Sequence, residues 1–177
     1  GRVEYAYYLM AKACGVEMMP CRLFEENGRA HFMTKRYDRV GEKERIHAQT
    51  MCAMSHMDFN RNQSYSYEQL FQIMRQLNLT YPEMEQMFRR MVFNAYARNC
   101  DDHTKNHSFL MDQSGKWRLA PAYDVCFAYN PTNFWVKQID SGSLMHQIRF
   151  RTDFEKRGDK FIMLWQVQPD GRYWEDD

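Results

Sequence analysis

The chain has no long apolar run, and this absence limits what the protein can be. No stretch approaches the roughly 20 apolar residues that a membrane-spanning helix needs, and the N-terminus does not resemble a signal peptide. The five cysteines are an odd number without a CxxC pair, which argues against a disulfide framework or a structural zinc site. A net charge of +1 gives no basis for a large nucleic-acid surface. We therefore expect a cytoplasmic protein that binds neither membrane nor nucleic acid directly.

The residues that are present are typical of a globular protein. Hydrophobic residues make up 44% and charged residues 27% of the 177 positions, enough for one domain or two small lobes. The fourteen Met residues favour an adaptable core over a Met-lined binding groove. The sequence begins with Gly rather than Met, so we expect a fragment or a processed product.

Local patterns predict helices and hairpins in the first third of the chain. Residues 4–14 are typical of a helix, which Gly15 can end in a left-handed turn. The pair Asn27-Gly28 lies between two runs of strand-forming residues, a strong hairpin signal. Residues 46–57 favour another helix.

Two further helices are expected in the middle of the chain. Ser66 begins the first, with Gln69 as its capping-box partner, and Pro82 suits the first turn of the second. The apolar stripe of the first helix is Leu70, Phe71, Met74 and Leu77. The stripe of the second helix is Met84, Met87, Phe88, Met91, Val92, Ala95 and Tyr96. After it, "SFLM" and "KWRLA" flank a second predicted hairpin turn at 112–115.

The stretch "NCDDHTKNHSFLMDQSGKWRLAPAYDV", residues 99–125, gathers acidic, amide and imidazole side chains around this hairpin. Asp101 and Asn106 share one loop after the long helix, and the hairpin can bring Asp124 back over the same cavity. Mg²⁺ prefers a few such oxygen ligands together with phosphate oxygens and water. A nearby carboxylate free of the metal can accept a proton from a hydroxyl nucleophile, as in phosphoryl transfer. Lys105 can neutralise charge on the transferred group.

Each residue of this stretch also has an alternative interpretation. Asp102 can cap a turn or be solvated, His103 can hold the loop backbone, and His107 suits a surface position at a strand edge. These three residues can also be read as a zinc or iron site, although their spacing is loose and no cysteine joins them. The magnesium hypothesis depends on its three residues occurring together.

The same stretch resembles the signature of the HipA family, serine/threonine kinases of bacterial toxin–antitoxin modules. That family carries a D-x-H-x-K-N loop followed by P-x-Y-D. The resemblance implies that Asp101 is the catalytic aspartate, that Asn106 is the loop asparagine that binds Mg²⁺, and that Asp124 is the second metal aspartate. It also implies that His103 shapes the loop and that Lys105 approaches phosphate.

The resemblance continues upstream and covers about residues 2–130. "EYAYYLMAKACG" resembles the family's N-E-Y/F helix, in which Glu4 sits where ordinary kinases place the helix-C glutamate. "FMTKRYDR" resembles the E-R-F-D-R hinge strand, which implies that Lys35 and Tyr37 border the adenine, with Lys35 replacing the usual acidic residue. "HAQTMCAM" resembles the segment after the hinge and implies that Gln49 lies near the nucleotide.

The resemblance implies an α+β, mainly α fold, a protein-kinase-like HipA C-terminal lobe in which β-hairpins form the hinge and the catalytic loop. It places a kinase core at 1–130, with a partial N-lobe hinge and a helical C-lobe, before a divergent or truncated segment at 131–177. The implied cofactors are ATP and Mg²⁺. The family's phosphate loop and ATP lysine precede the helix at 4–14, so a separate N-terminal lobe chain is an implied partner.

Three functions stay open at this point. The first is transfer of the γ-phosphoryl group of ATP to a serine or threonine of a protein. The resemblance implies an aminoacyl-tRNA synthetase or another translation protein as substrate, and a HipB-like DNA-binding antitoxin as partner. The second is a catalytically incomplete half or silent copy that docks an antitoxin. The third is a lipid or small-molecule kinase, because the same metal and base geometry serves any hydroxyl acceptor.

Overall fold

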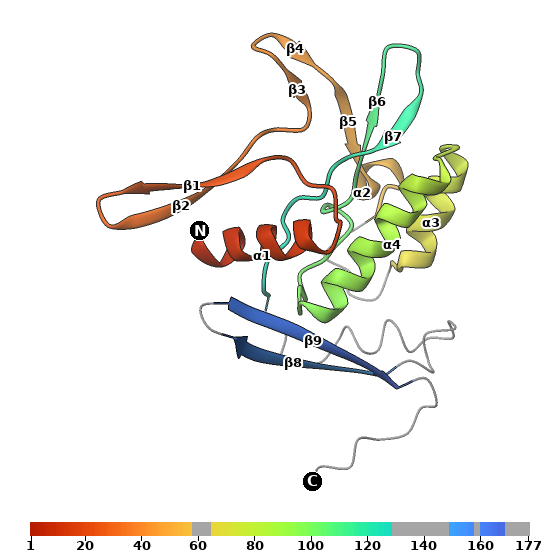
Figure 1. The fold of residues 1–177 in the computed structure, drawn as a ribbon. Coiled ribbons are helices and arrows are strands. Elements are labelled where there is room, and N and C mark those ends of the chain that lie inside the picture. The colour runs from red at the N-terminus through yellow and green to blue at the C-terminus, as the bar shows by residue number, and fades with distance from the viewer. Residues whose placement is uncertain (58–64, 129–148, 158–159, 169–177) are drawn as a thin grey trace. The chain divides into compact units, whose positions relative to one another are not determined.

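The computed structural model describes residues 1–57, 65–128, 149–157 and 160–168 (Figure 1). The chain separates into two compact units, Gly1–Asn130 and Pro131–Asp177. The first unit runs through α1 (Arg2–Ala13), β1 (Cys21–Glu26), β2 (Arg29–Thr34), β3 (Arg39–Val40), β4 (Glu44–Arg45), β5 (His47–Thr50), α2 (Met51–Met54), α3 (Tyr67–Gln76), α4 (Tyr81–Tyr96), β6 (Ser108–Met111) and β7 (Trp117–Leu119). The second unit contains the antiparallel pair β8 (Arg149–Arg157) and β9 (Lys160–Gln168). None of the helices in these ranges is long and apolar enough to cross a membrane.

The turns that the sequence predicts are present. After α1, Gly15 adopts a φ of +75°, in the left-handed region that glycine tolerates. Asn27 and Gly28 both have positive φ, 50° and 75°, as the two-residue turn between β1 and β2 requires. The turn between β6 and β7 contains Gly115 at φ +83°. The helix at the start of the chain and both hairpins are therefore confirmed.

The expected capping box starts α3, and a second box, which we did not predict, starts α4 beside the expected Pro82. Ser66 N donates to Gln69 Oε1 at 2.8 Å, and Gln69 N donates back to Ser66 Oγ at 3.3 Å. Thr80 N donates to Glu83 Oε2 at 2.7 Å. The two helices pack on β6 and β7 through a core of Met51, Leu70, Met74, Leu79, Met87, Phe109 and Leu119.

The buried face of α4 differs from the predicted stripe. Phe88, expected in the core, is 49% exposed, whereas Arg90 and Asn94 are buried. Arg90 Nη2 donates to the carbonyl oxygen of Ala120 at 2.7 Å, which satisfies part of the guanidinium inside the protein. The inner face of α4 therefore carries polar side chains that a search for apolar periodicity does not find.

The predicted helix at 46–57 is wrong over most of its length. Residues 47–50 form β5, which pairs antiparallel with β6, so that Gln49 lies opposite Phe109. Only the four residues of α2 are helical, and Thr50 Oγ1 accepts a hydrogen bond from Ala53 N at 3.1 Å at its start. Pairing with a strand about 60 residues later in the chain overrides the local preference.

The expected α+β class is confirmed. In the first unit helices occupy more of the chain than strands do, and the described residues of the second unit form β8 and β9. The strands lie in separate small sheets, of which β5-β6-β7 is the three-stranded one.

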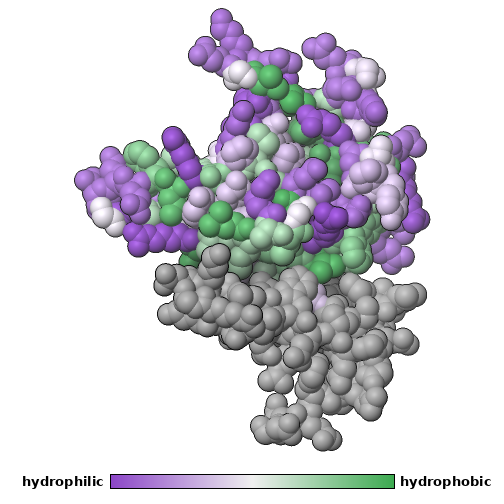
Figure 2. All heavy atoms as spheres, viewed as in Figure 1, coloured by the Kyte–Doolittle hydropathy of each residue, from purple (hydrophilic) through white to green (hydrophobic). Residues whose placement is uncertain are grey.

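Hydrophilic and hydrophobic residues occupy different parts of the first unit's surface. Figure 2 shows hydrophilic residues at the projecting tips of the β3–β4 and β6–β7 hairpins and hydrophobic residues over α1. On α1, Val3 is 57% and Leu9 50% exposed, whereas Ala11 is fully buried. The helix therefore carries apolar side chains on its outer as well as its inner face.

A second core cluster positions the segment that follows β7. It consists of Ala11, Val16, Phe93, Ala97, Ala122 and Val125. Backbone pairing supports it, since Ala122 N donates to Glu17 O at 2.8 Å and Ala128 N donates to Arg98 O at 3.1 Å. Residues 120–128 are thereby fixed between α1 and the end of α4, beside the loop that leads to β6.

Candidate active site

The loop between α4 and β6 is anchored to α2 by backbone hydrogen bonds. Just after α4, Arg98 takes a φ of +54°, which turns the chain into the loop. Met51 N donates to His107 O at 2.8 Å, and Cys52 N donates to Thr104 O at 3.1 Å. The first amides of a helix have no partner within the helix, so α2 uses them to hold this loop.

Asn106 is fixed within the loop by its backbone and by its side chain. Its backbone N donates to His103 O at 2.8 Å, and its Nδ2 donates to the backbone carbonyl of Asp101 at 3.0 Å. The residue is buried. Because the amide nitrogen serves the loop, the carboxamide oxygen is the atom of Asn106 that can act as a metal ligand.

The two neighbouring aspartates of the loop have different environments. Asp102 is 5% exposed, and its carboxylate accepts hydrogen bonds from His107 Nε2 at 2.9 Å and from the Tyr67 hydroxyl. Asp101 is exposed. The interpretations of Asp102 as a solvated residue and of His107 as a surface residue are therefore wrong, because the two side chains pair with each other in the interior. Of the two carboxylates, that of Asp101 is the one a substrate can reach.

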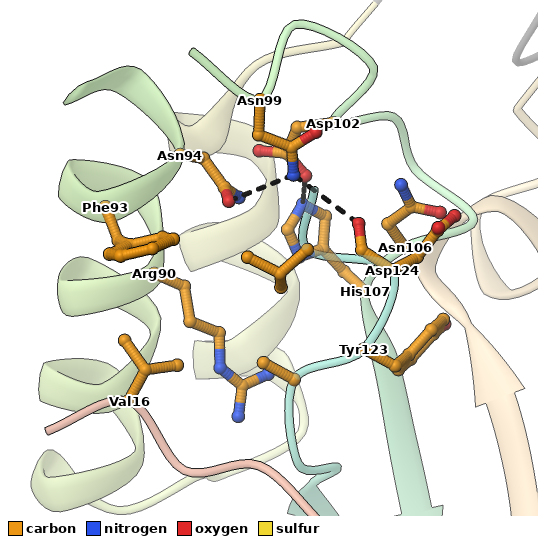
Figure 3. Close-up of a pocket in the computed structure, with 12 residues that line it drawn as sticks. Val16, Arg90, Phe93, Asn94, Asn99, Asp102, Asn106, His107, Tyr123 and Asp124 are labelled. Carbon is orange, nitrogen blue, oxygen red and sulfur yellow. Dashed lines mark hydrogen bonds and ion pairs between the residues drawn. The ribbon is translucent and has the colours of Figure 1, made fainter. Parts of the chain in front are cut away.

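Asp124 joins Asn106 at a pocket formed by the α4–β6 loop and the segment after β7 (Figure 3). Asp124 is exposed and has a φ of +54°, a conformation that aspartate tolerates better than most residues. The lining residues are Val16, Arg90, Phe93, Asn94, Asn99, Asp102, Asn106, His107, Ala122, Tyr123, Asp124 and Val125. The structure thus brings together the two predicted metal ligands, which are 18 residues apart in the sequence.

The pocket residues fit a magnesium ion better than a transition metal. A carboxamide oxygen and a carboxylate are hard ligands, and Mg²⁺ keeps several water or phosphate oxygens besides such protein groups. In the described part of the chain, no three His, Cys, Asp or Glu side chains come together as a metal site. Asp102 and His107, which a zinc or iron site would need, are bonded to each other. The zinc or iron alternative is therefore not supported.

Of the predicted nucleotide-contacting residues, Tyr37 contacts a residue of the pocket lining, whereas Lys35 and Gln49 do not belong to that lining. The ring of Tyr37 stacks on that of Tyr123, a pocket residue, with centroids 5.2 Å apart, and its hydroxyl donates to Ser108 Oγ at 3.3 Å. Lys35 is exposed, and its backbone N donates to Pro20 O at 3.0 Å. Gln49 lies in β5 and, like Lys35, is not among the described lining residues.

The hydroxyl of Tyr123 connects the loop to the following strand. It donates to the carbonyl oxygen of Lys105 at 2.5 Å and lies 2.5 Å from Ser108 Oγ. Burial raises the pKa of Tyr123 above its ordinary value, so the phenol keeps its proton. Tyr123, the residue before Asp124, thereby holds the backbone of Lys105 in place.

Burial also shifts the titration of other groups beside the pocket. It lowers the pKa of Arg90 to about 10, against the opposing effect of acidic groups that include Glu17 and Asp102. Burial, followed by the charges of Asp102 and Asp101, raises the pKa of Tyr65 to about 12. Arg90 is therefore cationic and Tyr65 neutral at physiological pH.

Several pocket residues were missed by the sequence reasoning. Arg90 and Asn94 occupy the inner face of α4, and Asn99 lies at the start of the loop. A signal was available, because Met87, Arg90 and Asn94 follow the helical period of three and four residues. The predicted stripe of this helix contains apolar residues and Tyr96 but no charged or amide side chain, so it leaves Arg90 and Asn94 out.

A sequence model described as the HipA-like C-terminal domain matches residues 1–167 of the chain. The chain belongs to the HipA family. The match extends beyond the range of about 2–130 in which we find the HipA motifs, and so includes most of the second unit.

Two further comparisons place the chain among known proteins. It is 26% identical over 136 residues to a protein of Sinorhizobium fredii (strain NBRC 101917 / NGR234) named "Putative kinase Y4mE". That match covers 71% of the chain and 32% of the relative. A chain in the solved complex of the Shewanella oneidensis MR-1 toxin–antitoxin system HipA, HipB and operator DNA superposes with a TM-score of 0.59 at 21% identity. The superposition covers 71% of this chain and 34% of the Shewanella chain, and at this identity it shows the fold alone. The chain therefore spans about a third of the length of either protein.

Proposed function

We propose that this chain carries the catalytic region of a HipA-type kinase, which transfers the γ-phosphoryl group of ATP to a serine or threonine hydroxyl of a protein. One observation carries the proposal. The Asn106 carboxamide and the Asp124 carboxylate line one pocket from two separate segments, beside an exposed Asp101 whose backbone carbonyl holds Asn106. This is the division of labour that phosphoryl transfer needs, with two ligands for a metal and one carboxylate for the nucleophile.

Each loop residue has a role in this proposal. Asp101 orients the acceptor hydroxyl and takes its proton, while Asn106 and Asp124 hold Mg²⁺. When bound, Mg²⁺ supplies positive charge to the β- and γ-phosphates of ATP. Lys105 adds a cation at the loop surface, and His103, whose carbonyl accepts the Asn106 amide, sets the curvature of the loop. These five residues make up the proposed catalytic and metal-binding set.

The adenine is proposed to lie at the hinge. Tyr37 supports this place because its ring stacks on Tyr123, next to Asp124 in the sequence, and so connects the hinge to the metal site. Lys35 and Gln49 complete the proposed nucleotide contacts. They lie on the same β2-to-β5 stretch of chain but outside the pocket lining, so the nucleotide would extend beyond the pocket to reach them.

The proposed partners follow from the family. The fold neighbour comes from a HipA, HipB and operator DNA complex, which supports a HipB-like antitoxin as a partner of this protein. A translation protein such as an aminoacyl-tRNA synthetase is the proposed substrate, and the cytoplasm the proposed compartment. The phosphate loop and ATP lysine of the family would come from an N-terminal lobe, in the same protein or in a separate chain.

Calorimetric titration of the purified protein with ATP, with and without Mg²⁺, tests the metal assignment. Asp124→Asn removes the charge but keeps the shape and tolerates a positive φ. We expect it to weaken Mg²⁺-dependent ATP binding by about tenfold or more, because one of two protein ligands loses its charge. Asp112→Asn makes the same change in the exposed β6–β7 turn and should leave binding unaltered.

The outcomes separate the three functions. Unaltered Mg²⁺-dependent affinity in Asp124→Asn would remove Asp124 from the metal site. Absence of binding heat in the wild-type protein would favour the docking module, which needs no nucleotide. Transfer of labelled phosphate to lipid or small-molecule acceptors, but not to proteins, would favour the third function.

A further inference from the structure

A line of polar side chains joins the two segments that carry the proposed magnesium ligands, and Figure 3 shows its members Asn94, Asn99, Asp102 and Asp124. Beginning at Asp102, the carboxylate accepts a hydrogen bond from the Tyr67 hydroxyl. Asn94 Nδ2 donates to the same hydroxyl at 3.1 Å, and Asn99 Nδ2 donates to Asn94 Oδ1 at 3.1 Å. Asn99 Nδ2 also donates to the backbone carbonyl of Asp124, at 3.5 Å. We call Tyr67, Asn94 and Asn99 the relay.

The hydrogen bonds of the relay fix one another's direction. A tyrosine hydroxyl has one hydrogen, and that of Tyr67 goes to Asp102, so the oxygen accepts from Asn94. This orients the Asn94 amide with its oxygen toward Asn99. Burial and the charge of Asp102 raise the pKa of Tyr67 well above its ordinary value, so the hydroxyl keeps its hydrogen.

The relay occupies positions where apolar residues would be expected. Asn94 lies on the inner face of α4 beside Phe93, and Asn99 is 3% exposed. Burying an amide costs free energy unless hydrogen bonds replace those lost to water. The hydrogen bonds of Asn94 and Asn99 offset this cost without adding net stability. Its presence on the core face is better explained by what it holds than by stability.

At one end the relay holds the backbone of a proposed ligand, and at the other end it holds a side chain of the loop that carries the second proposed ligand. At one end it binds the carbonyl of Asp124, whose positive φ sets the direction of the carboxylate. At the other end it binds Asp102, which pairs with His107 and so closes the loop around Asn106. Movement at either end is transmitted through the hydrogen bonds that orient the Tyr67 hydroxyl and the Asn94 amide.

We propose that Tyr67, Asn94 and Asn99 are positioning residues that hold Asn106 and Asp124 in a fixed relation, so that one magnesium ion can bind both. This proposal rests on the function proposed above, since it takes these two residues as ligands. None of the three relay side chains contacts substrate in the proposal. Their loss should therefore affect the metal dependence of nucleotide binding more than the rate at saturating Mg²⁺.

The variant Tyr67→Phe tests the relay, because it removes only the hydroxyl shared by Asp102 and Asn94. Tyr81→Phe is the matched control, since Tyr81 is 81% exposed at the start of α4. Hydrogen–deuterium exchange of the nucleotide-free protein should accelerate by about threefold or more both at 101–107 and at 122–126 in Tyr67→Phe. The Mg²⁺ concentration for half-maximal ATP binding should rise about tenfold, the equivalent of losing one or two hydrogen bonds. Tyr81→Phe should change neither.

A second variant, Asn99→Ser, tests the relay even if Tyr67→Phe does not fold. Asn99→Ser removes the bonds to Asn94 and to the Asp124 carbonyl but leaves the bonds of the Tyr67 hydroxyl in place. It should accelerate exchange at 122–126 and raise the Mg²⁺ requirement by a similar factor. Because one cut already breaks the relay, the double variant Tyr67→Phe/Asn99→Ser should be little worse than either single variant.

Two results would overturn the relay. One is faster exchange confined to the neighbourhood of residue 67, with 122–126 as protected as in the wild type. The other is full multiplication of the two single effects in the double variant. Wild-type protein without Mg²⁺-dependent ATP binding would instead overturn the proposed function, while the exchange measurements would still decide whether the relay holds both segments.

Discussion

The adjacent residues Asp101 and Asp102 should respond to mutation in opposite ways. Asp102→Ala removes the acceptor of two buried donors, the Tyr67 hydroxyl and His107 Nε2. A buried donor without a partner costs about 1–3 kcal/mol, so we expect the free energy of unfolding to fall by about 3–4 kcal/mol. That is a large share of the roughly 5–15 kcal/mol that stabilises a typical domain.

The isosteric variant Asp102→Asn should cost only about 1 kcal/mol, the difference between charged and neutral hydrogen bonds. Its oxygen can accept from Tyr67, and its Nδ2 can donate to His107 if the imidazole moves its proton to Nδ1. That nitrogen has no hydrogen-bond partner within the described residues, so the tautomer can change without breaking another bond.

Asp101→Asn should leave stability within about 0.5 kcal/mol, as for most exposed substitutions. Phosphoryl transfer should fall by about 10²–10⁴-fold, the usual contribution of a general base, while ATP affinity stays nearly constant. Urea unfolding monitored by circular dichroism gives the stabilities, and incorporation of labelled phosphate gives transfer. Equal turnover in Asp101→Asn and wild type would remove Asp101 from its role. A smaller loss of stability in Asp102→Ala than in Asp101→Asn would refute the assignment of the buried and exposed carboxylates.

Two further predictions concern groups that support the site. Burial alone would raise the pKa of Glu83, but hydrogen bonds from Thr80 and Leu119 outweigh burial and lower this pKa. The ionised Glu83 therefore stabilises the fold above its unfolded-state pKa of about 4.3. This stabilisation is lost as the pH falls through the lower pKa of the folded state. Unfolding midpoints between pH 6 and 3 should therefore fall more steeply in wild type than in Glu83→Gln, and parallel curves would contradict this. Tyr123→Phe should cost about 1–2 kcal/mol in urea unfolding and Tyr37→Phe less, because the Tyr123 hydroxyl makes two 2.5 Å contacts and that of Tyr37 one at 3.3 Å. The reverse order would show that Tyr37 is the more important of the stacked pair.

The elements that the sequence predicts correctly are those with local causes. The capping box at Ser66 and the proline in the first turn of α4 both lie within four residues of the helix start that they determine. The Asn27-Gly28 turn is fixed by the φ values that these two residues tolerate. In each of these elements the physical cause is contained in a few consecutive residues, so the sequence alone is sufficient.

The strand at 47–50 could not be found in this way, because its cause lies in β6, about 60 residues later. The same limit applies to His107, which looks like an exposed strand-edge residue until the partner carboxylate of Asp102 is seen. The motif at 99–125 allowed Asn106 and Asp124 to be singled out, but not the pocket that both line. Residue types indicate which side chains can bind a metal, whereas their burial depends on contacts between distant parts of the chain.

The polar residues whose burial the sequence did not reveal share a location. Asp102, His107, Arg90 and Asn94 are all buried polar groups where patterning predicts surface or apolar residues, and all four line the pocket of Asn106 and Asp124. Sequences are locally consistent where only stability matters, and departures concentrate where a site must be held in shape. A lone buried amide on α4 would be a local peculiarity, but four such residues around one pocket indicate a common cause. The buried polar residues therefore indicate the same site as the motif at 99–125, by an independent argument.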